Sequence, residues 1–147
     1  MSSTPTAWSD SVARRFIDTN ILVDADDAFD PRKQQLALDL LVDLRARQEA
    51  VLLTQVLQDY FVTTTRKLGL EAHIARQRVT QFGRFELIQP TRAMLLAAID
   101  LQQNHSLSFW DALDVQTASK ARCGVLYSED LQAGARIGNV IIVNPFT

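Results

Sequence analysis

The chain alternates between short, fully apolar runs and longer segments with an apolar stripe at helical spacing. The short runs are rich in Val, Ile and Leu and predict β-strands over residues 15–23, 51–53, 85–88, 125–127 and 140–143. The longer segments predict helices over residues 31–48, 54–68, 70–82, 91–104 and 108–121. Strands that alternate with helices form β-α-β units. The pattern therefore predicts an α/β fold of three layers, α/β/α, with a mostly parallel central sheet.

One polar triplet interrupts the first predicted strand. Asp18, Thr19 and Asn20 lie between the apolar pairs 16–17 and 21–22. A carboxylate buried among apolar side chains is costly unless a partner compensates its charge. We therefore interpret Asp18 as a functional residue, although a hydrogen bond to a neighbouring turn is an alternative.

The size and composition indicate one domain. A length of 147 residues and a hydrophobic content of 47% suffice for a single core, which we expect over residues 14–147. The Ser- and Thr-rich residues 1–13 lack the features of a secretory signal, so we expect a flexible tail on a cytoplasmic protein. No apolar run is long enough to suggest a membrane span. A single cysteine and two distant histidines argue against a disulfide and a structural zinc site.

The charge balance leaves the question of nucleic acid open. The net charge of -2 is unfavourable for a protein that binds phosphates. If four aspartates gather at one metal, however, the rest of the chain has 13 acidic residues against 15 basic ones. Charge therefore neither supports nor excludes an RNA partner.

Four separated aspartates are the candidate chemistry. In an open parallel sheet, ligands bind beyond the carboxyl ends of the strands. Asp18 lies toward the end of the first strand, Asp130 follows the strand 125–127, Asp111 lies in the first turn of the helix 108–121, and Asp59 lies in the helix after the second strand. Hard divalent cations prefer oxygen ligands and neutralise the repulsion between clustered carboxylates. The pattern therefore predicts a metal site that can hydrolyse a phosphodiester.

Several of these residues also have ordinary structural interpretations. Ser108 and Asp111 have the spacing of a helix cap, so capping is an open alternative to a role as metal ligand. Asp59 alone is typical of a solvated helix residue and Asp130 of a turn. Asp114, one turn beyond Asp111, is a possible extra ligand, with a solvated or supporting acid as the favoured interpretation.

Candidate RNA contacts are weaker. Trp110 has the chemistry to stack on a base, but an aromatic residue in a helix on a sheet is more often part of the core. Arg66 and Lys67 suit a phosphate backbone, but such residues usually form a solvated face.

Taken together, the motifs resemble those of PIN domains, and among these the VapC-type toxins of toxin–antitoxin pairs. The similar segments are residues 16–23 (FIDTNILV), 54–61 (TQVLQDYF), 107–113 (LSFWDAL), 126–131 (LYSEDL) and 139–146 (NVIIVNPF). The resemblance implies a PIN-like domain in which Asp18, Asp59, Asp111 and Asp130 bind metal and Thr19 and Asn20 shape the site. It also implies a ribonuclease that uses Mg²⁺ or Mn²⁺, a homodimer, and inhibition by a small antitoxin that inserts a segment into the cleft.

The sequence departs from the family at one ligand. Asp59 stands where the family usually has a glutamate, which is one methylene longer. We therefore keep two hypotheses: a magnesium-dependent endoribonuclease, in which Thr19, Asn20 and Ser108 orient ligands or water, and a non-catalytic PIN-like module that binds RNA or protein. A phosphatase ranks last because Asp18 is followed by Asn20 where a second aspartate is needed.

Overall fold

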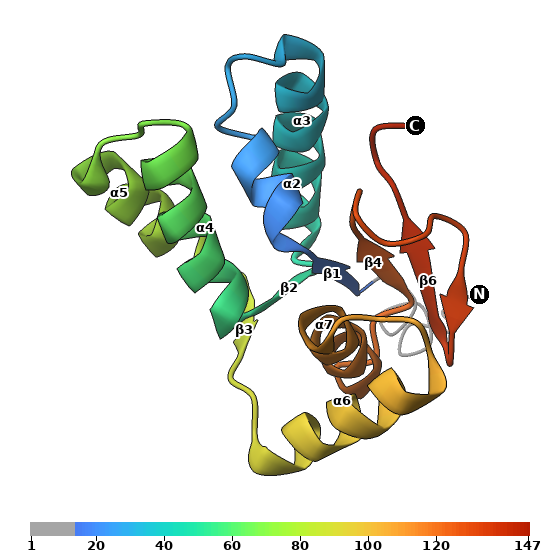
Figure 1. Cartoon of the computed structure of the whole chain (residues 1–147). Helices are drawn as coiled ribbons and strands as arrows, with labels where there is room; N and C mark the ends of the chain where they lie inside the picture. The colour runs from blue at the N-terminus through green and yellow to red at the C-terminus, as the bar shows by residue number, and fades with distance from the viewer. Residues whose placement is uncertain (1–13) are drawn as a thin grey trace.

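The computed structural model describes residues 14–147 (Figure 1), so the tail expected over residues 1–13 lies outside the described residues. The strands are β1 (Arg15–Ile17), β2 (Ala50–Leu53), β3 (Glu86–Ile88), β4 (Val125–Tyr127), β5 (Arg136–Ile137) and β6 (Val140–Val143). The helices are α2 (Thr19–Asp24), α3 (Pro31–Arg47), α4 (Thr54–Lys67), α5 (Ala72–Phe82), α6 (Arg92–Asn104) and α7 (Phe109–Lys120).

The strands form one sheet in the order β3-β2-β1-β4-β6-β5. All neighbouring strands are parallel except β5 and β6, which are antiparallel. Successive strands β1, β2 and β3 extend the sheet in one direction, and β4 then pairs with the other side of β1. The strand order thus reverses between β1 and β4, and ligands bind at such a reversal in open α/β sheets.

Helices cover both faces of the sheet. Helix α7 contacts β1, β2, β4 and β6, and α6 packs on its outer side. Helix α3 contacts β2 from the opposite face, where α2 lies between α3 and α4 (Figure 1). The three-layer α/β/α fold with a mostly parallel sheet is therefore confirmed. None of the helices within residues 14–147 combines the length and apolarity needed to cross a membrane.

The core lies between these layers and combines strand residues with the inward-facing residues of the helices. Phe16, Leu52, Leu126 and Ile142 come from four different strands and are at most 1% exposed. Burying one such side chain contributes about 1.5–3 kcal/mol. This rigid sheet fixes the strand ends from which the site is built.

The prediction of a strand over residues 15–23 is wrong beyond Ile17. Strand β1 ends there, and helix α2 begins at Thr19 because the Asp18 carboxylate caps it by accepting the Thr19 backbone N–H at 2.7 Å. Ile21 and Leu22 remain fully buried, so their apolar character reflects a buried helix rather than a strand. The polar triplet is thus the junction between strand and helix.

Other differences are small. Helix α5 begins at Ala72 rather than at residue 70, and the two-residue strand β5 was not predicted. A strand that short has no period from which to recognise it. Gly69, just beyond the end of α4, has a φ of +68°, a conformation that favours glycine.

Candidate metal centre

A cavity of about 190 Å³ lies where the strand order reverses. Its lining comes from the end of β1, the start of α2, helices α4 and α7, and the turn after β4: Asp18, Thr19, Asn20, Gln55, Val56, Asp59, Trp110, Asp111, Asp114 and Asp130. All five aspartates considered in the sequence analysis therefore line one cavity. Gln55 and Val56 were not predicted as site residues.

Asp18 is buried at the junction between β1 and α2. Its side chain is only 7% exposed. One carboxylate oxygen accepts the Thr19 N–H at 2.7 Å, and the other accepts the Ser128 hydroxyl at 2.8 Å. Thr19 thus orients Asp18 through its backbone.

Asn20 and Ser128 connect Asp18 to Asp130. The Asn20 amide nitrogen donates to Asp130 Oδ2 at 3.0 Å and to Asp18 Oδ2 at 3.3 Å. The buried Ser128 hydroxyl also accepts the Asp130 backbone N–H at 3.2 Å. Sequence reasoning missed Ser128, although a small hydroxyl directly after a buried strand, next to a candidate acid, is a usable signal.

Helix α7 brings two further acids to Asp18. Ser108 caps the helix by accepting the Asp111 backbone N–H at 3.1 Å, so the capping interpretation describes Ser108 correctly. Ser108 does not line the cavity. Carboxylate oxygens of Asp18, Asp111 and Asp114 all lie within 4.8 Å of one another. The cap therefore orients the turn that presents Asp111, and Asp114 follows one turn later.

The electrostatics of this triad suit a cation. Burial raises the pKa of Asp114 well above its usual range, and the nearby charge of Asp18 adds to the effect. Burial also raises the pKa of Asp18, against the opposing effect of its hydrogen bonds. Within residues 14–147, the cavity lining contains no lysine, arginine or histidine to balance these acids. The residues present therefore fit a hard divalent cation with oxygen ligands.

The structure corrects one of the two interpretations favoured for Asp114. A solvated acid is wrong, because Asp114 is only 7% exposed and its carboxylate lies close to those of Asp18 and Asp111. Whether Asp114 is a metal ligand or a supporting acid stays a prediction.

Asp59 and Asp130 lie at the periphery of the cavity. Both are exposed residues that line it. Neither belongs to the compact group of carboxylates identified among the described residues. Partial desolvation at the edge of the cavity raises the pKa of Asp59.

The candidate RNA contacts separate into two groups. Trp110 lines the cavity and is 58% exposed, so its interpretation as a core residue is wrong. It packs edge-on against Phe109, with ring centroids 5.0 Å apart, and Phe109 packs against the core. Arg66 and Lys67 lie in the exposed last turn of α4 and do not line the cavity.

Comparison with known proteins relates this fold to two solved structures. One is a toxin–antitoxin complex from Klebsiella pneumoniae, with a TM-score of 0.66 and 20% identity, covering 89% of this chain and 97% of that chain. The other is VapC20 of Mycobacterium tuberculosis, a sarcin-ricin loop cleaving toxin, with a TM-score of 0.61 and 18% identity, covering 76% of this chain and 86% of that chain. No protein-family model matches the sequence, and no curated protein does. The two structures show the fold, so the PIN-like fold expected from the sequence is confirmed.

Proposed function

We propose that this protein is a metal-dependent endoribonuclease and the toxin of a VapBC-type toxin–antitoxin pair. The observation that carries the proposal is the acid cavity at the reversal of strand order, where Asp18, Asp111 and Asp114 converge and no basic side chain from residues 14–147 lines the cavity. The solved structures with the same fold support the choice of substrate, since one of them is described as cleaving the sarcin-ricin loop.

The triad is the part of the cavity best suited to hold Mg²⁺ or Mn²⁺. Asp18, Asp111 and Asp114 would supply the inner ligands, and Asp59 and Asp130 would act from the periphery. When bound, such an ion neutralises the acids, lowers the pKa of a water molecule and stabilises charge on the leaving oxygen of a phosphodiester.

The protein's own contribution is orientation. Thr19 and Ser128 hold the two oxygens of Asp18, and Asn20 keeps Asp130 beside it. A carboxylate fixed by hydrogen bonds loses little conformational freedom when a ligand binds, which favours binding. Trp110, exposed beside the acids, offers an aromatic surface for a base of the bound RNA.

Two protein partners form part of the proposal. The exposed apolar side chains Leu95, Leu96 and Ile99 of α6 support a homodimer, because a contiguous apolar surface is typical of an interface. An antitoxin is supported by the structure of a toxin–antitoxin complex that shares the fold. A segment with a basic side chain would complement the acidic cavity.

Cleavage of RNA in defined metal conditions tests the proposal. Purified protein is incubated with structured and single-stranded RNAs in Mg²⁺, in Mn²⁺ and in excess chelator, and the products are resolved by length. We expect internal cleavage with either metal and intact RNA with chelator. RNA that is bound but never cleaved would favour the non-catalytic PIN-like module, whose motivation is the aspartate at position 59.

A further inference from the structure

Asp59 and Tyr60 are neighbours on α4 with opposite environments. Asp59 is exposed and lines the acid cavity, whereas Tyr60 is fully buried. The position of the Asp59 carboxylate therefore depends on how Tyr60 anchors this part of the helix. The N-terminus of α4 does not supply such an anchor, because Leu53 precedes it and no side chain caps it.

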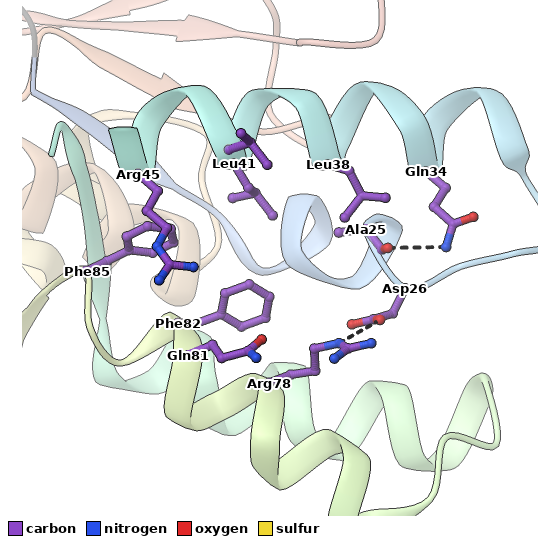
Figure 2. A pocket seen from close by; sticks show the side chains of 11 residues that line it. Ala25, Asp26, Gln34, Leu38, Leu41, Arg45, Arg78, Gln81, Phe82 and Phe85 are labelled. Carbon is purple, nitrogen blue, oxygen red and sulfur yellow. Dashed lines mark hydrogen bonds and ion pairs between the residues drawn. The ribbon is translucent and has the colours of Figure 1, made fainter. Parts of the chain in front are cut away.

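Tyr60 is anchored by a hydrogen bond to Asp26, just beyond the end of α2. Its phenol donates to Asp26 Oδ2, and Arg78 of α5 donates to Asp26 Oδ1 at 3.1 Å. Figure 2 shows this ion pair, in which Asp26 and Arg78 point toward each other across the space between α2 and α5. The Tyr60 ring also packs edge-on against Phe82, at 5.2 Å and 85°. One carboxylate thus joins three helices.

These contacts connect α4, which carries Asp59, to α2, which begins directly after Asp18. Helix α2 begins at the Asp18 cap and ends two residues before Asp26. A hydrogen bond between Asp26 and α4 therefore fixes the position of α4 relative to the helix that starts at Asp18. Aspartate has a short side chain, so a small displacement of α4 removes Asp59 from a metal that a longer acid would still reach.

We propose that Asp26, Tyr60 and Arg78 form a positioning cluster that holds Asp59 against the metal cavity. The inference rests on the proposed metal centre and assigns the three residues no contact with substrate or metal.

The test is a double-mutant cycle read by metal binding. Mn²⁺ affinity is measured by electron paramagnetic resonance of the free ion, without RNA, for wild type, Tyr60→Phe, Asp59→Glu and the double variant. We expect Tyr60→Phe to weaken Mn²⁺ binding about fivefold. This is a smaller effect than the 10- to 100-fold loss that is typical when a residue hydrogen-bonded directly to a metal ligand is replaced. In the Asp59→Glu variant the longer acid can still reach the metal, so we expect Tyr60→Phe to weaken Mn²⁺ binding less than about twofold. Such a difference between the two backgrounds is the energetic coupling expected of neighbouring sites.

Tyr127→Phe is the matched control. It removes another buried phenol, one that accepts a hydrogen bond from Arg15 at 2.7 Å and does not line the cavity. We expect it to lower the melting temperature without changing Mn²⁺ affinity. Should Tyr60→Phe fail to fold, Arg78→Gln replaces it, because this side chain is partly exposed and its loss weakens the same cluster.

The outcomes separate this inference from the proposed function. Equal weakening of Mn²⁺ binding by Tyr60→Phe in both backgrounds, or none in either, would overturn the positioning role. A melting temperature that falls while Mn²⁺ affinity stays constant would do the same, since it indicates a merely structural contact. If the coupling is found but wild type cleaves no RNA, the positioning cluster stands and the ribonuclease proposal fails.

Discussion

Ser128 offers a direct test of how the acid cavity is built. Its fully buried hydroxyl donates to Asp18 Oδ2 at 2.8 Å and accepts the Asp130 backbone N–H at 3.2 Å. Ser128→Ala removes this hydroxyl and leaves the strand and turn otherwise intact. If the hydroxyl orients Asp18, both the stability of the domain and its affinity for metal should fall.

The expected magnitude follows from these two bonds, which are the shortest that the hydroxyl makes; it also accepts the Asn20 amide and the Leu131 backbone N–H, both at 3.4 Å. A hydrogen bond to a charged group contributes about 1.5–3 kcal/mol, and a neutral one about 1 kcal/mol. Part of the second loss is recovered because Asp130 lies at the exposed edge of the cavity, where water can replace the bond. We therefore expect the free energy of unfolding to fall by about 2–3 kcal/mol, or about 4–12 °C in melting temperature for a domain of this size.

The assay combines calorimetric unfolding in chelator with Mn²⁺ titration. Ser119→Ala is the control, because Ser119 is an exposed residue of α7 and its loss should change stability by less than about 0.5 kcal/mol. We expect Ser128→Ala to weaken Mn²⁺ binding about tenfold, as for other residues that orient a ligand. Stability and affinity both indistinguishable from those of Ser119→Ala would refute the role given to Ser128.

Three further predictions concern the acids and their surroundings. Ser108→Ala removes the cap of α7 and should lower the free energy of unfolding by about 1 kcal/mol in urea titrations; an unchanged midpoint would contradict this. In chelator, stability should fall as the pH rises above 3.8, because the raised pKa values of Asp18 and Asp114 make the folded state bind more protons than the unfolded state. This decline of stability with pH should be shallower in Asp114→Asn than in wild type, and equal slopes would contradict the raised pKa values of the buried pair Asp18 and Asp114. Trp110→Ala should raise the KM for RNA about tenfold, as expected for the loss of one stacked base, while kcat and melting temperature stay nearly constant; an unaltered KM would exclude stacking.

The fold could be predicted because its signals are strong and local. Runs such as residues 125–127 and 140–143 are continuously apolar, as expected of strands covered on both faces. The alternation with helices then leaves few topologies, since parallel crossovers are right-handed. The assignment of Asp18 and Asp130 to strand ends follows from the same reasoning.

Other features depend on three-dimensional packing and escaped the pattern. Residues 19–23 contain β-branched and apolar side chains typical of a strand, but the Asp18 cap starts a helix there. Asp114 and Trp110 lie on the same helix, α7, and local spacing does not reveal that the acid is buried and the aromatic exposed. Ser128 acquires its importance only when β4 lies beside β1.

RNA cleavage by Asp18→Asn tests the central claim most directly. Asparagine has nearly the size and shape of aspartate, so the substitution should preserve the fold while removing one buried carboxylate of the triad. Asp39→Asn, an exposed aspartate of α3 outside the cavity, is the matched control. We predict that wild type and Asp39→Asn cleave RNA in Mg²⁺ and that a folded Asp18→Asn does not. Normal cleavage by Asp18→Asn would contradict the assignment of the metal centre.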